Sequence, residues 1–143
     1  MPERDHLLVV ATNFRESHGG VQAHLAQLSP RLVERGIRTT VVYLGRRTRP
    51  EVVDGVRVLP LRRRADVRDV LGVPDPAQWR RFTAAVASGK LPEGPVTAVA
   101  THTRFFPMSA LGIRLAARLR VPVVHTEHGA GSVVTGSPLV EAA

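Results

Sequence analysis

Four short apolar runs constrain the fold of this chain more than any other feature. They lack the alternation of polar and apolar residues that marks a half-exposed strand, which is typical of strands buried on both faces of a sheet. Helical patterns separate them along the chain. Strands that alternate with helices predict an α/β fold with a parallel, doubly wound, Rossmann-like sheet. The runs cover residues 7–12, 39–44, 96–101 and 121–126.

The residues after the first run predict an amphipathic helix. Gly36 is suited to end this helix. Pro30 lies inside the pattern, where it removes a backbone hydrogen bond and clashes with the preceding turn, so we expect a kink or break near Ser29. Four apolar residues recur at helical spacing and form one stripe: Val21, Leu25, Leu28 and Leu32.

Residues 51–59 predict a small β-hairpin, because Asp54-Gly55 supplies a turn of positive φ between β-branched runs. Residues 62–68 predict a basic, irregular segment that either contacts an anionic partner or is simply solvated. Helices are expected at three further places, namely at residues 76–88, at residues 107–119 and from residue 137 onward.

The composition fits one domain covering residues 1–143 and narrows the chemistry. The chain has no cysteine, which excludes disulfides, thiolate metal sites and a cysteine nucleophile. No apolar run approaches the ~20 residues of a membrane span. We therefore expect a cytoplasmic protein that is made without a targeting segment.

The formal net charge of +8 comes almost wholly from arginine, since Lys90 is the only lysine. A basic surface attracts phosphorylated small molecules, anionic membrane or nucleic acid. Peripheral contact with the inner face of a membrane is compatible with this charge. Aromatic residues are not interleaved with the basic ones as they are in stacking platforms, so we expect no nucleic-acid partner.

One edge of the predicted sheet collects the residues suited to chemistry. In open α/β sheets, ligands bind beyond the carboxyl ends of the strands. Three loops leave those ends, at residues 15–20, 101–106 and 127–131. Four of the six histidines lie in or beside these loops: His18, His102, His125 and His128.

The pair Gly19-Gly20 directly precedes the first predicted helix. Backbone N–H groups at a helix N-terminus attract anions, and the missing side chains let a phosphate approach. A flexible turn explains the pair equally well. The pair belongs neither to the dinucleotide fingerprint G-x-G-x-x-G nor to a Walker loop.

Candidate polar residues follow the later strands. His128 can exchange a proton near neutral pH, or it can shape its loop through a hydrogen bond to the backbone. His102 faces either the site or the sheet, and the sequence does not choose between them. Arg104 can clamp a phosphate or carboxylate, or it is a solvated loop residue. Glu127, before His128, and Glu16 are the only carboxylates near this edge.

A metal ion is not expected from these residues. His125, Glu127 and His128 offer ligand atoms, but alternate residues of a strand face opposite sides. His125 and His128 therefore diverge unless the strand has already ended, and we expect His125 in or near the core. No other spacing indicates a zinc site.

The motifs in this order resemble the N-terminal domain of family-4 retaining glycosyltransferases, which have the GT-B fold. The resemblance covers nearly the whole chain. The segments that carry it are His18-Gly19-Gly20-Val21, the helix closed by Arg35-Gly36, the strand at 39–42, the hairpin at 52–58, Thr101-His-Thr-Arg-Phe-Phe106, and residues 121–129, which end in Thr126-Glu-His-Gly129.

The resemblance implies the acceptor-side half of an enzyme that moves a sugar from a nucleotide-sugar to an acceptor, without a required metal or other cofactor. It places Gly19 and Gly20 against the donor phosphates and His128, as the catalytic histidine, near the sugar and acceptor. Arg104 is implied on the acceptor side. His102, Glu127 and Gly129 complete the expected substrate-binding set.

Two residues depart from the family pattern: Gln22 stands where a glutamate often follows the Gly-Gly-Val segment, and Pro30 is unusual in that helix. In addition, no two glutamates are separated by seven residues as in the family's C-terminal domain. We therefore expect the nucleotide site on a second, C-terminal domain and no activity without it. The alternatives are a non-catalytic module that binds a sugar phosphate or a partner and, least favoured, a basic nucleic-acid-binding domain.

Overall fold

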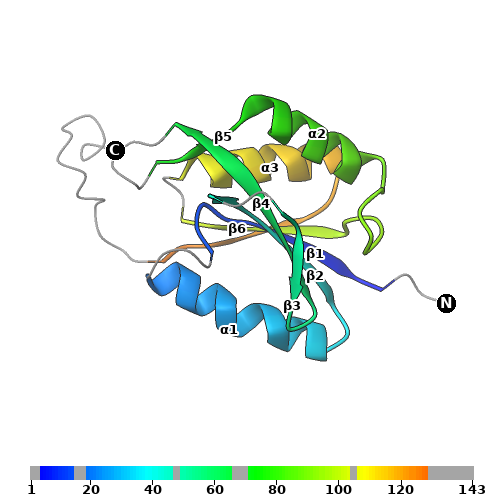
Figure 1. Ribbon diagram of the computed structural model, residues 1–143. Helices are drawn as coiled ribbons and strands as arrows, with labels where there is room; N and C mark the ends of the chain where they lie inside the picture. The colour runs from blue at the N-terminus through cyan, green and yellow to red at the C-terminus, as the bar shows by residue number, and fades with distance from the viewer. Residues whose placement is uncertain (1–3, 15–18, 47–48, 66–70, 104–105, 129–143) are drawn as a thin grey trace.

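The computed structural model describes residues 4–14, 19–46, 49–65, 71–103 and 106–128. Strands and helices alternate along most of the chain, as the apolar runs predict (Figure 1). The elements are β1 (His6–Val10), α1 (Gly20–Glu34), β2 (Arg38–Gly45), β3 (Glu51–Val53), β4 (Val56–Ala65), β5 (Val73–Pro74), α2 (Pro76–Ala87), β6 (Ala98–His102), α3 (Pro107–Leu119) and β7 (Val123–Thr126).

The described strands form one sheet in the order β3-β4-β2-β1-β6-β7, and β5 pairs with β4. Strands β4, β2, β1, β6 and β7 run parallel, whereas β3 and β5 are antiparallel to β4. Strand β1 lies inside the sheet, with β2 and β4 on one side of it and β6 and β7 on the other. The predicted doubly wound α/β fold is confirmed.

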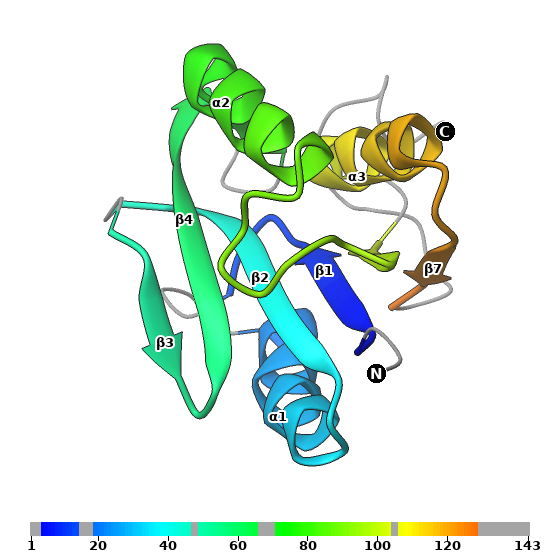
Figure 2. The same ribbon diagram turned by 90° about the vertical axis from the view of Figure 1, so that its right-hand side faces the viewer.

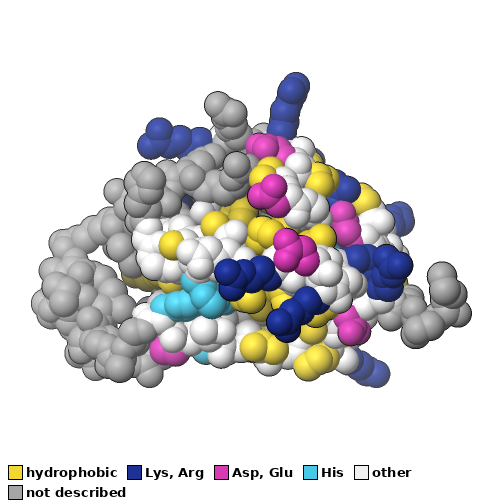
Figure 3. Space-filling model, turned by 90° about the horizontal axis from the view of Figure 1, so that it is seen from below, with side chains coloured by type: hydrophobic (Ala, Val, Ile, Leu, Met, Phe, Trp, Pro, Cys, Tyr) yellow, Lys and Arg dark blue, Asp and Glu magenta, His cyan; other side chains and the backbone are white. Residues whose placement is uncertain are grey.

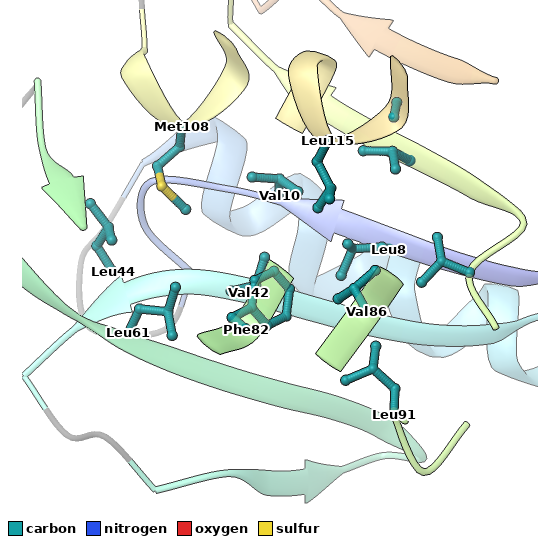
Figure 4. Close-up of a cluster of buried hydrophobic side chains, with 13 residues drawn as sticks. Leu8, Val10, Val42, Leu44, Leu61, Phe82, Val86, Leu91, Met108 and Leu115 are labelled. Atoms are coloured by element: carbon teal, nitrogen blue, oxygen red, sulfur yellow. The ribbon is translucent and has the colours of Figure 1, made fainter. Parts of the chain in front are cut away.

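Helices cover both faces of the sheet, with α1 on one face and α2 and α3 on the other (Figures 1 and 2). Successive strand residues point to opposite faces, so β1 contributes Val9 to the α1 side and Leu8 and Val10 to the α2–α3 side. Figure 4 shows the latter cluster, in which Phe82 of α2 and Met108 of α3 pack against the strands.

The predicted hairpin is present, and its second strand has a larger role than expected. Asp54 and Gly55 have φ of 51° and 77° and join β3 to β4. Strand β4 continues to Ala65 and pairs in parallel with β2. The expectation of an irregular segment at 62–68 is therefore wrong for residues 62–65, because β2 pairs with this strand as far as Arg62 and β5 pairs with Arg63 and Ala65.

Helix α1 corrects a second expectation. It runs without a break through Pro30, and its buried residues Leu25 and Ser29 hold it against the sheet. Packing of this face outweighs the hydrogen bond that Pro30 cannot donate. No helix in the described ranges is long and apolar enough to cross a membrane.

Candidate functional site

The carboxyl ends of β1, β6 and β7 meet the N-terminus of α1 at one edge of the sheet. Parallel pairing of β6 with both β1 and β7 aligns these strand ends. Ser109 of α3 fixes the end of β6, because its hydroxyl donates to the carbonyls of His102 and Thr103 at 2.7 and 2.9 Å. The predicted site edge therefore exists and is held by buried hydrogen bonds.

Three histidines from three elements meet at this edge. His102 is the last residue of β6, His128 follows β7, and His24 lies on α1 one turn after its start. Their ring centroids lie 5.0 to 5.9 Å apart. Nδ1 of His102 and Nε2 of His128 share a hydrogen bond of 3.0 Å, in which one ring donates and the other accepts.

The histidines differ in exposure. His102 is buried, His128 is half-buried and His24 is exposed. Figure 3, which views the molecule from the α1 side, shows histidine side chains gathered in one patch on the surface. The histidine cluster therefore extends from the buried end of β6, at His102, to the exposed surface of α1, at His24.

Burial makes the neutral imidazole the favoured form at this cluster. Burial, together with repulsion of a second positive charge by the neighbouring His128, His24 and His125, lowers the pKa of His102 to about 4. Burial also lowers the pKa of His128, with His24 acting in the same direction and Glu127 opposing it. Both rings are mainly neutral near pH 7 and can accept a hydrogen bond.

Several buried polar atoms at this edge lack partners among the described residues. They are Oγ1 of Thr12, Nε2 of His102 and Oγ1 of Thr103. Buried polar groups are almost always hydrogen-bonded, and an exception calls for an explanation such as a bound ligand or water. Thr103 also has φ of 66°, a conformation that costs energy for a β-branched residue and is typical of functional sites.

The glycine pair forms the start of α1. Gly19 is the N-cap residue and Gly20 the first helical residue, and no side chain caps the helix by a hydrogen bond. A Cβ added to Gly20 would meet nothing within 4 Å, so the space beside this residue is open, whereas a Cβ added to Gly19 would lie 2.5 Å from Oε1 of Gln22. Gly20 and His24 are four residues apart and lie on the same face of α1.

His125 and Glu127 lie beside the cluster. His125 is exposed, which makes its predicted place in or near the core wrong. Its Nδ1 lies 2.8 Å from Oγ1 of Thr101, and its Nε2 lies 3.4 Å from Oε2 of Glu127. The core placement fails because β7 is the last strand in the described part of the sheet and three of its four residues are exposed.

The structure thus brings together part of the predicted site. Gly19, Gly20, His102 and His128 converge, Glu127 lies next to them, and Arg104 and Gly129 lie outside the described residues. His24 was not predicted. Its spacing from Gly20 is the one signal that indicates it, since residues four apart share a helical face.

The described residues line only a small cavity at this edge, of about 40 Å³. Pockets for small-molecule ligands usually span roughly 300–1,000 Å³, so this cavity is much smaller than a typical ligand pocket. The lining includes Thr12 and His102, each of which has a buried polar atom without a partner among the described residues. The full set is Ala11, Thr12, Asn13, Val21, Gln22, His102 and Phe106.

Comparison with known proteins gives a family and a fold. Residues 18–140 match the family described as Glycosyltransferase Family 4. The structure is similar to that of sucrose-phosphate synthase from Thermosynechococcus elongatus, with a TM-score of 0.54 and 15% identity over 94% of this chain. The chain spans 35% of the length of that protein. It matches none of the curated proteins with which it was compared.

Proposed function

Because this chain belongs to glycosyltransferase family 4, we propose that it is the acceptor-side domain of an enzyme that transfers a sugar from a nucleotide-sugar to a sugar or lipid acceptor. The observation that carries the proposal is the shared position of the uncapped start of α1 and the histidine cluster. The start of α1 would offer positive dipoles to a phosphate, and the histidine cluster would offer a neutral imidazole to a hydroxyl group.

The start of α1 would stabilise the leaving phosphate. Free N–H groups and the helix dipole favour negative charge at this end, and the first turn contains no acidic residue to compete. Gly20 leaves room for the phosphate. Fixed dipoles aimed at developing charge are usually a large catalytic contribution, so we propose that transfer requires no metal ion.

His128 would act on the acceptor or the transferred sugar. Its lowered pKa keeps the ring neutral, so it can accept a hydrogen bond from a hydroxyl group. The hydrogen bond with buried His102 fixes the ring orientation. We propose that the anomeric configuration is retained, as in the enzymes that the sequence motifs resemble.

The nucleotide would bind a second domain facing this edge. The small cavity of the described residues supports this arrangement, as does the match to about a third of a longer structural neighbour. The 143-residue chain is then expected to be inactive unless it is joined to a nucleotide-binding domain.

The proposal is tested with this chain joined to a competent donor domain, by measuring kcat/KM for the nucleotide-sugar. Gly20→Trp fills the phosphate space, and His128→Ala removes the imidazole. Each is expected to lower kcat/KM about 100-fold or more, as loss of one charge-stabilising donor does. Circular dichroism confirms that the variants fold.

Two matched controls separate the site from its surroundings. Ala26→Trp adds the same side chain at an exposed position of α1, and His125→Ala removes an exposed histidine outside the cluster. Both are expected to retain transfer within a few-fold of the unsubstituted protein. Unchanged transfer in both Gly20→Trp and His128→Ala would overturn the assignment.

A second candidate is a non-catalytic domain that binds a sugar phosphate without a second domain. The orphaned polar atoms beside the open helix start favour it. Calorimetry of the 143-residue chain with sugar phosphates distinguishes the two, since only the non-catalytic module is expected to bind them unaided.

A further inference from the structure

Three imidazole rings at the site edge each present one nitrogen to a shared centre. The nitrogens of His24, His102 and His128 lie within 4.8 Å of one another. We propose that these three histidines form a binding site for a transition-metal ion, with Zn²⁺ as the expected occupant. Metal binding is tested separately from sugar transfer, and an ion on His128 would compete with the hydroxyl group that the proposed function assigns to this ring.

The spacing fits three ligands of one ion after a small adjustment. Zn–N bonds of 2.0–2.1 Å in a tetrahedral site place ligand nitrogens roughly 3.3 Å apart. His102 and His128 already approach to 3.0 Å through Nδ1 and Nε2. His24 is exposed, so rotation of its side chain can close the remaining distance without moving the core.

The ligand type selects the ion. Imidazole nitrogens suit Zn²⁺, Cu²⁺ and Ni²⁺, whereas Mg²⁺ prefers oxygen ligands in octahedral geometry. Three histidines leave one tetrahedral position for water or another oxygen ligand. The proposal therefore commits to binding of Zn²⁺ and to exclusion of Mg²⁺.

The test is calorimetric titration of the tag-free 143-residue chain with Zn²⁺ and, separately, with Mg²⁺ at pH 7.5. One Zn²⁺ per chain and no Mg²⁺ are expected. His24→Ala and His128→Ala should each weaken Zn²⁺ binding about tenfold or more, since even loss of an outer-shell partner costs about 10- to 100-fold. Co²⁺ in place of Zn²⁺ should give intensified visible bands from tetrahedral coordination.

His125→Ala is the matched control, because His125 is an exposed histidine next to the cluster but is not one of its three members. It should bind Zn²⁺ as the unsubstituted chain does. His24→Asn provides a second variant on the exposed helix position. The proposal is overturned if the unsubstituted chain binds no Zn²⁺, or if the His24 variants bind it as tightly as the His125 variant does.

Discussion

Individual histidines in this protein have very different surroundings. His6 is fully buried in β1, where its Nδ1 lies 2.9 Å from the carbonyl of Gly94 and its Nε2 lies 2.8 Å from Oγ1 of Thr40. A carbonyl can only accept, so Nδ1 of His6 carries the proton and Nε2 accepts from the threonine hydroxyl. Burial lowers the pKa of His6, and this makes stability depend on pH.

We expect the free energy of unfolding to fall as the pH drops below about 6.5. In that range the unfolded chain protonates His6 while the folded chain resists it, so the unfolded state binds more protons. Each such histidine contributes a slope of up to about 1.4 kcal/mol per pH unit. Urea unfolding at pH 7.5 and pH 5.5 measures the change.

His6→Asn tests the origin of this dependence. Its stability should be lower at pH 7.5, by roughly 1–2 kcal/mol for the lost hydrogen bond, but should fall less between pH 7.5 and 5.5. His125→Asn, at an exposed position, should keep the full dependence. A variant at His6 with the same pH slope as the unsubstituted chain would contradict the explanation.

The sequence predicted where the site lies better than it predicted which residues form the site. His102 and His128 were expected at the strand ends because parallel strands align their carboxyl ends. His24 escaped because its contribution depends on how α1 is rotated over the sheet, which the apolar stripe defines only coarsely. The positive φ of Thr103 was also unpredictable, since β-branched residues rarely adopt it.

A single side chain, that of Asp75, caps the N-terminus of helix α2. Asp75 is its N-cap, and its side chain accepts hydrogen bonds from the backbone N–H groups of Ala77 and Gln78 at 3.0 and 3.1 Å. These bonds, chiefly that from Gln78, lower the pKa of the carboxyl group. Arg62 and Arg64 also approach it, at 3.3 and 3.9 Å, from strand β4.

Asp75→Ala is expected to lower the melting temperature by about 3–6 °C, because it leaves the first N–H groups of α2 without a cap. Asp75→Asn keeps an accepting oxygen and should lower it much less. The arginines are largely exposed, and ion pairs of that kind contribute little. Equal losses in the two variants, measured by thermal melts, would assign the effect to the charge instead.

Most elements could be predicted because local signals and packing agree. Helix α3 runs over Pro107–Leu119 as expected, since a proline starts it and an apolar stripe continues it. The extension of β4 to Ala65 was missed because its arginines mask the strand pattern. Pairing with β2 as far as Arg62 and with β5 at Arg63 and Ala65, which are tertiary contacts, determines that segment.

At the scale of the whole molecule, a net charge of +8 coexists with exposed apolar residues on β7, the last strand in the described part of the sheet. Val123 and Val124 of β7 are 40% and 57% exposed, and they point to opposite faces. Exposed edge strands can pair with another chain. Charge repulsion between copies opposes such pairing and is screened by salt.

Self-association of the 143-residue chain is therefore expected to increase between 50 mM and 500 mM NaCl in sedimentation experiments. Val124→Lys should reduce it, because a charge on the strand blocks edge pairing. Ile113→Lys adds the same charge at an exposed position of α3 and should reduce it less. Association that weakens with salt would instead indicate attraction between charges.

The central position of β1 has a consequence for folding kinetics. Leu7 pairs with Thr39 on one side and with Ala98 on the other, and the hydrogen bond from His6 to Thr97 joins residues 91 positions apart. Closing the longer loop costs about 1 kcal/mol more entropy than closing the shorter one, and such distant pairing slows folding. During synthesis β1 can pair with β6 only after residues 98–102 have been made, so we expect a nascent chain arrested before that point to leave one side of β1 without its partner strand.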